Sequence, residues 1–393
     1  MAMATSGAMS FISVLLVRLG APNWLIGLES SLPALVTILA VLPVGAFVQR
    51  QRNLATTAGW ARLIFRIILS TFALLPLLPP SIASYVLVIG YGSTAIPGTV
   101  LQVSFTSLLG QATTPDRRPR MLSTRMAING LAGAAIGFLA GQWLDFAPYP
   151  LNYQVLFLST VIGGIGSFYT LSRLRLPSVP EKEIAKRRRA SLKEMFQLIK
   201  DAPLFRNYSL AAFLFRFAMA MPQALYSIYR VRTLGASDAW IGILLTVERL
   251  VSVVAYFGLG RLLTRPNFRR RLWTSCIGMA LFPFSMALVG TPEMLIIPSV
   301  IVGLFSAGME IYLTDTLIQV SPGDQRPTFI AANAFLANVT TFVAPLIGTA
   351  LADAIDIRIV LMLSAGLRAI GGLAFWRLRV GTESSPSTTS ASS

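Results

Sequence analysis

Residues 101–145 read LQVSFTSLLGQATTPDRRPRMLSTRMAINGLAGAAIGFLAGQWLD, and residues 309–353 read MEIYLTDTLIQVSPGDQRPTFIAANAFLANVTTFVAPLIGTALAD. The two stretches align without a gap at a constant offset of 208, and each is an apolar run, a short charged turn and a second apolar run. The matching positions are Thr106 with Thr314, Gln111 with Gln319, Asp116 with Asp324, Arg118 with Arg326, Pro119 with Pro327 and Asp145 with Asp353. A repeat of this size outranks any local motif as evidence of fold, so the sequence predicts two halves of similar build.

A second pair of stretches supports the duplication. Residues 19–28 read LGAPNWLIGL and residues 234–243 read LGASDAWIGI, at an offset of 215. The same offset places Gly45 on Gly260 and Arg50 on Arg265.

The amino-acid composition predicts that this chain is embedded in a lipid bilayer. Of its 393 residues 54% are hydrophobic and only 12% are charged, whereas a soluble domain carries about 25% charged residues. The net charge of +17 does not indicate a nucleic-acid partner, because the basic residues lie between long apolar runs. The single cysteine, Cys276, excludes an intrachain disulfide.

Apolar runs of about twenty residues, the length that crosses a bilayer as a helix, recur along the whole chain. We count twelve spans, at about 3–18, 24–48, 56–79, 82–110, 119–142, 152–173, 207–230, 239–263, 270–289, 292–319, 327–352 and 356–377. The predicted fold class is therefore an all-α integral membrane protein, with twelve transmembrane helices in two pseudo-symmetric six-helix bundles. The bundles are residues 1–176 and 207–380.

The distribution of Lys and Arg predicts the orientation. With both termini cytoplasmic, 23 basic residues fall in inner segments and four in outer segments, as the positive-inside rule requires. The four outer residues are Arg18, Arg230, Arg232 and Arg358. The first span is short and has no basic inner flank, so we expect either a start codon further upstream or a short first helix.

Residues 177–206 form the longest polar stretch and join the two bundles on the cytoplasmic side. Ser191 and Glu194 match a capping box that opens an amphipathic helix, which we expect to lie on the membrane surface and contact anionic lipid. A plain solvated linker is the alternative. The low-complexity tail, 381–393, is expected to be disordered.

These features resemble the major facilitator superfamily over the whole chain. The most specific elements are the repeated turns from Asp116 to Arg120 and from Asp324 to Thr328, and the two LGA…IG turns. The resemblance implies a solute transporter whose central cavity opens alternately to either side of the membrane, with parallel halves built of inverted triplets. We expect a monomer with no cofactor.

The resemblance also suggests which loop residues act in gating, namely Gly45, Arg50, Asp116, Arg118, Gly260, Arg265, Asp324 and Arg326. The loop after the second span departs from the family pattern, because Gln49 stands at the usually acidic position. The fourth and fifth spans lack the buried arginine and the glycine–proline pattern of proton-driven drug exporters.

Ionisable residues inside lipid are functional candidates by default. Arg216 in span seven and Glu310 in span ten lie at similar depth, and the resemblance assigns both spans to the cavity wall. The two side chains are expected to face one another or a solute. A purely structural ion pair that closes the cytoplasmic side is the alternative.

Further candidates for the cavity wall are polar residues of spans four, seven and eight: Gln102, Tyr91, Gln223, Tyr226 and Glu248. Packing between helices is the alternative use of the amide and hydroxyl groups. Glu248 and Arg249 are adjacent, about 100° apart on a helix, so we expect one of them, Glu248, to point into the cavity.

Gly133, Gly137 and Gly141 recur every four residues and form a small-residue face that lets another helix approach closely. Such a face is suited to the moving contact between the two halves.

The sequence contains no zinc-site, nucleotide-binding or nucleophile motif, and we find no enzymatic constellation. With no histidine in the chain, a proton relay must use carboxylates, and we predict Glu310 as the coupling group with Arg216 as its partner.

The leading hypothesis is a secondary transporter of a small organic solute in the cytoplasmic membrane, driven by an ion gradient such as that of protons. An importer of a sugar or organic anion is the runner-up within transport, and a transporter-like receptor or lipid-handling protein is the alternative outside it.

Overall fold

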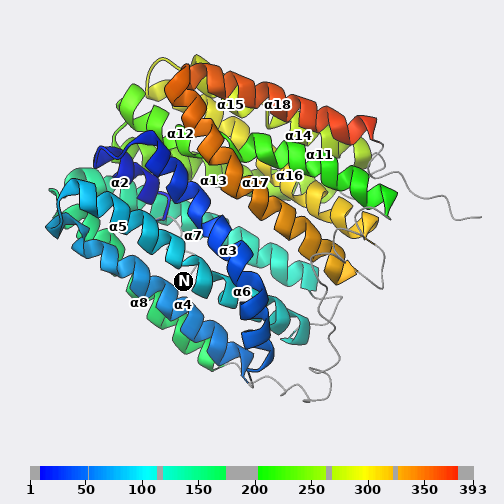
Figure 1. Ribbon diagram of the computed structural model, residues 1–393, viewed down its shortest axis with the longest axis horizontal. Coiled ribbons are helices and arrows are strands. Elements are labelled where there is room, and N and C mark those ends of the chain that lie inside the picture. The colour runs from blue at the N-terminus through cyan, green and yellow to red at the C-terminus, as the bar shows by residue number, and fades with distance from the viewer. Residues whose placement is uncertain are drawn as a thin grey trace, which may run out of the picture.

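The computed structural model describes residues 9–51, 53–112, 118–173, 202–262, 268–321 and 326–378, and the regular elements of these residues are all helices (Figure 1). Ten helical segments within them are long and apolar enough to cross a membrane. The predicted amphipathic helix in 177–206 and the tail 381–393 cannot be compared, because 174–201 and 379–393 lie outside the described residues.

The N-terminal half contains one helix or helix pair for each of the first six predicted spans. These are α2 (Ile12–Arg18), α3 (Asn23–Gln49), α4 (Leu54–Thr71) with the 3₁₀ turn η1 (Phe72–Leu77), α5 (Pro80–Ser93) with α6 (Ala95–Ala112), α7 (Arg118–Phe146) and α8 (Leu151–Ser172). Helices α2 and α7 are not among the ten segments named above.

The C-terminal half matches the other six spans, and three of them are interrupted. Its elements are α11 (Pro203–Ala220), α12 (Gln223–Ile228) and the π-helical turn η2 (Tyr229–Thr233), then α13 (Asp238–Leu262), α14 (Phe268–Gly278) with α15 (Leu281–Leu288), η3 (Glu293–Leu295) with α16 (Ile296–Val320), α17 (Arg326–Ala354) and α18 (Ile357–Arg377).

The outward surface of the helices is apolar, as lipid requires. Ile162 is 75% exposed and Leu77 is 74% exposed, and a soluble monomer rarely exposes contiguous apolar surface on this scale. Side chains cap the starts of α4 and α18. Asn53 Oδ1 accepts hydrogen bonds from the amides of Ala55 and Thr56 (both 3.1 Å) at the start of α4.

Arg368 on α18 compensates for two prolines that interrupt neighbouring helices. Proline has no N–H, so Pro222 leaves the carbonyl of Ala218 without its helical donor, and Pro283 does the same to Met279. The Arg368 guanidinium donates to Met279 O (3.1 Å) and to Ala218 O (3.4 Å), and the hydroxyl of Ser364 on the same helix also donates to Ala218 O (2.8 Å). An unsatisfied buried carbonyl costs about 1–3 kcal/mol, which explains a cation that is only 1% exposed at this depth.

The two halves meet mainly through two helix pairs, α7 with α13 and α3 with α17 (Figure 1), and α12 adds smaller contacts with α2 and α3. At the first pair, a Cβ on Gly242 would stand 2.7 Å from Gly137 O and 2.9 Å from Gly141 Cα. At the second, a Cβ on Gly27 would stand 2.6 Å from Thr349 Oγ1. The repeats relate the two pairs, because Gly27 matches Gly242 at the offset of 215, and Gly141 matches Thr349 at the offset of 208.

Candidate functional site

A cavity of about 990 Å³ lies between the two halves and is lined by both. Seven of its described lining residues are charged, which is unusual for groups at membrane depth. They are Glu29 from the N-terminal half, and Arg216, Arg230, Glu248, Arg249, Glu310 and Arg368 from the C-terminal half. Among these residues, the N-terminal wall therefore carries an acid and no cation, whereas all four arginines stand on the C-terminal wall.

Most of the residues that the sequence suggests for the cavity wall line this cavity. They are Arg216, Glu310, Gln223, Tyr226, Tyr91 and Glu248. Gln102 does not line it and is exposed on α6. Among the described residues, no group of three or more potential metal ligands is found.

Arg216 and Glu310 both line the cavity, but they form no ion pair in this conformation. Glu310 Oε2 accepts a hydrogen bond from the hydroxyl of Tyr256 on α13 (2.9 Å). Arg216 lies within electrostatic range of Tyr208 and Cys276, and its buried Nε has no hydrogen-bond partner. The expected pairing of the two is therefore absent from this arrangement of the halves.

The expectation that only one of Glu248 and Arg249 reaches the cavity is wrong, since both line it. Their directions do differ by about 100° around α13, as adjacent helical residues must. Both side chains are long, and α13 borders the cavity on the C-terminal wall, so the cavity contacts a broad arc of this helix.

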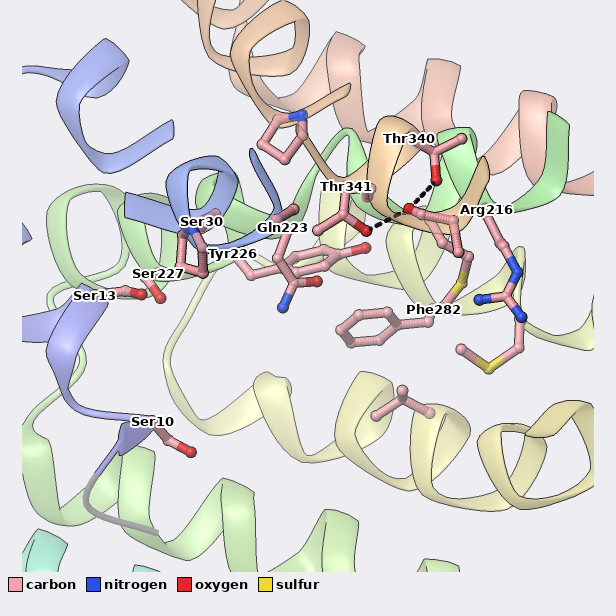
Figure 2. Close-up of a pocket in the computed structure, with 18 of the residues that line it drawn as sticks. Ser10, Ser13, Ser30, Arg216, Gln223, Tyr226, Ser227, Phe282, Thr340 and Thr341 are labelled. Carbon is pink, nitrogen blue, oxygen red and sulfur yellow. Dashed lines mark hydrogen bonds between the residues drawn. The ribbon is translucent and has the colours of Figure 1, made fainter. Parts of the chain in front are cut away.

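Arg368 also orients Tyr226 and the short helix α12. Its Nη2 donates to the Tyr226 hydroxyl (2.6 Å) and to Met219 O (3.3 Å). The break at Pro222 turns Gln223, Tyr226 and Ser227 toward the cavity. Figure 2 shows Gln223 and Tyr226 between Ser13, Ser30 and Ser227 on one side of the view and Arg216 on the other.

Sequence reasoning did not predict two of the charged residues that line the cavity, Arg230 and Glu29. Arg230 was assigned to an outer segment, but the π-helical turn η2 places it in the cavity lining, with a buried Nε that has no hydrogen-bond partner. Glu29 was not singled out, although an acid within the second span was a sufficient signal. It is 4% exposed and accepts hydrogen bonds from Ser13 Oγ (2.9 Å) and Ser30 Oγ (3.3 Å).

Hydrogen bonds between the halves gather at one face of the molecule. We call the face where α8 ends and α11 begins the linker side, and the opposite face the far side. On the far side, Arg18 at the end of α2 forms an ion pair with Asp238 at the start of α13 (2.8 Å) and donates to Ala236 O (3.2 Å). Asp238 also accepts from Tyr153 Oη (3.2 Å), and its amide donates to Asp145 Oδ1 (2.9 Å). We call this set the ionic latch.

A second set of far-side bonds repeats the first with the halves exchanged. Arg232 donates to Asn23 Oδ1 (2.7 Å) and to the carbonyl of Ala21, and Asn23 Nδ2 donates to Asp353 Oδ1 (2.6 Å). Asn23 matches Asp238 at the offset of 215, and Asp353 matches Asp145 at the offset of 208. We call this set the amide latch.

Part of the predicted gating loops lies outside the described residues, namely Asp116, Arg265 and Asp324. Arg118 and Arg326 are the first residues of α7 and α17, and Gly260 lies in the last turn of α13. Gly45 lies in α3, and a Cβ there would meet nothing within 4 Å, while Arg50 is exposed just after this helix.

The glycine face of α7 contacts α13 unevenly. A Cβ on Gly141 would stand 2.6 Å from Asp238 O, and one on Gly137 would stand 3.5 Å from Leu245 Cβ. A Cβ on Gly133 would meet nothing within 4 Å. Near mid-depth, Thr246 Oγ1 donates across the halves to Ala134 O (3.0 Å).

Two helical bundles around a central charged cavity define the class of this protein as a membrane transporter fold. Residues 1–319 match the sequence profile of the Major Facilitator Superfamily, and the chain belongs to that family. Family membership agrees with the prediction of a non-enzymatic membrane protein and confirms the predicted fold class. No curated protein matches this sequence at a significant level.

Solved structures of other transporters have the same fold. A mutant of the nucleoside transporter NupG is similar with a TM-score of 0.72, 12% identity and coverage of 96% of both chains. The inward-open xylose transporter XylE from E. coli gives 0.71, with 12% identity over 98% of this chain and 93% of that one. The human organic anion transporter MFSD10 (TETRAN) gives 0.64, with 12% identity over 95% and 98%.

Proposed function

We propose that this protein is a secondary active transporter that moves a small organic solute across the cytoplasmic membrane by alternating access. The observation that carries the proposal is the charged cavity between two halves whose described polar contacts with one another gather on one side. A cavity lined by both halves lets a solute respond to their relative movement. Transport of this kind needs no cofactor, and we expect a monomer surrounded by lipid and no nucleic-acid partner.

We propose that the linker side is cytoplasmic, as the distribution of basic residues predicts. The conformation described above is then closed to the outside, and the similar xylose transporter structure is likewise an inward-open one. Ala185→Cys in the linker tests the orientation, because the native Cys276 is buried. The variant should not react with an impermeant thiol reagent added outside intact cells, and the parent chain gives the background. Labelling from outside contradicts the proposed topology.

The solute is expected to carry a charged or strongly polar group. Arg216 and Arg230 line the cavity, the buried Nε of each has no hydrogen-bond partner, and guanidinium groups bind carboxylates and phosphates in a planar fork. This observation favours an organic anion, the class of solute for which the similar human transporter MFSD10 is named. Gln223 and the hydroxyl of Tyr226 are further groups that we propose for solute contact.

We propose that a proton gradient drives transport through a carboxyl group of the cavity wall. Glu310 remains a proposal for this role, with Arg216 as a partner that approaches in another conformation, and Glu248 is in reserve. Glu310→Gln tests it. The variant should exchange solute and fail to accumulate it under a pH gradient, whereas accumulation with the parent's pH dependence excludes Glu310.

Counterflow in proteoliposomes separates transport from the alternative, a receptor or lipid-handling protein without coupled transport. A thermal-shift screen of the purified chain against metabolites and drugs identifies candidate solutes first. A solute that stabilises the protein and exchanges across the membrane supports a transporter. A stabilising solute that never exchanges supports the receptor.

A further inference from the structure

Glu29 is a buried carboxyl group on α3 whose described hydrogen-bond partners are two serine hydroxyls. Ser13 on α2 and Ser30 on α3 donate to the same oxygen, Oε2. The side chain reaches the cavity, yet the residue is only 4% exposed. In the part of the chain that the structure describes, no lysine or arginine forms an ion pair with Glu29.

The other acids of the cavity wall have different surroundings. Glu310 is exposed to the cavity and is held by Tyr256. Glu248 is close enough to Arg230 for the two charges to attract one another. Of the three cavity acids Glu29 is therefore the buried one, and no described cation forms an ion pair with it.

Such a group is expected to bind a proton. Burying an isolated charge is costly, so an acid at membrane depth serves a function by default. A protonated carboxyl keeps both serine bonds as an acceptor and carries no net charge. A hard metal cation takes about six or more oxygen ligands, and Glu29 with its two serines offers fewer, so the site fits a proton better than a metal ion.

The polar groups around Glu29 that the structure describes do not include a charged partner. Tyr91 on α5 is close enough to interact with it electrostatically. From the C-terminal half, Gln223 and Tyr226 on α12 line the same cavity, and Arg230 lies one turn beyond Ser227. The part of α17 that packs on α3 presents Pro345 and Thr349, which carry no charge.

Glu29 is also placed to respond to the far-side latches. It lies six residues along α3 from Asn23 of the amide latch, which is about 9 Å at the rise of an α-helix. Its partner Ser13 lies five residues before Arg18 of the ionic latch on α2. The bond from Ser13 to Glu29 thus joins two helices of the N-terminal half, α2 and α3, that each contribute a residue to a latch.

We propose that Glu29 is the proton-carrying group of this transporter, an inference that rests on the proposed transport function and competes with Glu310 for that role. When the latches part, water on the far side delivers a proton, and an O–H bond forms on a Glu29 oxygen. When the latches close, water in the cavity accepts the proton, the O–H bond breaks, and the carboxylate returns to its serine donors. One proton crosses for each cycle.

Infrared difference spectroscopy of the purified full-length chain between acidic and alkaline buffer tests proton binding without any solute. Glu29→Gln should remove a band of a protonated carboxyl group. Glu310→Gln should retain it, and so should Glu293→Gln, a control at an exposed acid outside the cavity. In proteoliposomes, Glu29→Gln should retain counterflow and lose accumulation driven by a pH gradient. Glu29→Asp, which keeps the acid, should retain both at a reduced rate.

The outcomes separate this inference from the proposed function. If the band and the pH-driven accumulation both survive in Glu29→Gln, or if accumulation follows sodium and not protons, Glu29 is not the proton carrier. If the parent chain shows no counterflow with any stabilising solute, transport fails as the function, and the infrared band still decides whether Glu29 holds a proton. Should Glu29→Gln fail to fold, the parent band is assigned with Glu29→Asp, which must shift it.

Discussion

The contact of α7 with α13 and the contact of α3 with α17 are two versions of one structure, related by the internal repeat. Each has a close approach at a glycine, Gly242 in one and Gly27 in the other, and each ends in a far-side latch. They differ at two positions, where Asp238 of the ionic latch corresponds to Asn23 of the amide latch and Gly141 corresponds to Thr349. The geometry was kept after duplication while the charge was not.

The two contacts are therefore expected to differ in how tightly they hold the halves together. The α7–α13 contact is backbone against backbone, with an ion pair whose acid is 6% exposed at its side chain. The α3–α17 contact is backbone against the Thr349 side chain, and at its end the neutral Asn23 side chain bonds to Arg232 and Asp353 in more exposed positions. We expect the first contact to act as the tighter joint and the second as the one that yields more easily.

The largest effect is expected from Gly242→Ala. Its Cβ would meet backbone atoms of Gly137 and Gly141, which cannot rotate away, and overpacking costs about 1–3 kcal/mol or more. Gly27→Ala should cost less, because Thr349 can change its rotamer. Thermal unfolding of the purified variants and their counterflow rates measure both.

Gly133→Ala is the matched control, since a Cβ there meets nothing within 4 Å. Alanine is favoured over glycine in a helix by up to about 1 kcal/mol, so this variant should be neutral or slightly more stable. Equal losses for Gly242→Ala and Gly27→Ala would show that the two contacts do not differ in tightness.

An intermediate effect is expected from Asp238→Asn, which gives the ionic latch the neutral side chain of the amide latch. The pair with Arg18 is partly exposed, so its loss should cost about 1 kcal/mol, and about 1.4 kcal/mol corresponds to a tenfold change in population. A cysteine at Ser227 in the cavity should then react several-fold faster with an impermeant thiol reagent added on the far side of oriented proteoliposomes.

Salt gives an independent check of the same latch. High ionic strength weakens an exposed ion pair, so labelling of the Ser227→Cys chain with an intact latch should rise with salt, and labelling after the further change Asp238→Asn should not. If the two chains respond to salt in the same way, the ion pair between Arg18 and Asp238 does not contribute to closure of the far side.

The smallest effect is expected from the reverse change, Asn23→Asp. It gives Arg232 a charged partner but also places a carboxylate beside Asp353, so the two effects should nearly cancel, within about 0.5 kcal/mol. Adding Asp353→Asn should reveal the gain and slow far-side labelling at Ser227→Cys. If the double variant labels faster than the single one, Arg232 and residue 23 do not interact as described.

Sequence patterns predicted the fold well, because lipid imposes length and apolarity on every span. The twelve predicted spans match helices or helix pairs, and the repeat at offsets of 208 and 215 predicted two similar halves. The interruptions at Pro222 and Pro283 were not predicted. The carbonyls they free accept hydrogen bonds from Arg368 and Ser364, residues far away in the sequence whose role no local pattern indicates.

The candidate site was predicted in part. Arg216, Glu310 and Glu248 were expected to line a cavity, because a charged side chain in contact with lipid is energetically costly. Arg230 was misplaced, because the π-helical turn η2 continues span seven beyond the residue where the span was expected to end. The partners of each charge could not be predicted, since Glu310 meets Tyr256 from α13 and not Arg216.

Composition, span length and internal repeats are properties of the chain alone, and they were sufficient to predict a duplicated, all-helical membrane protein. Which equivalent residues of the two halves meet became visible only in the folded molecule. Asp145 and Asp353 form a repeated pair in the sequence, but only the packing of one half on the other shows that each holds the first turn of the opposite half's helix. A contact between halves depends on their relative placement, and no pattern within either half encodes that directly.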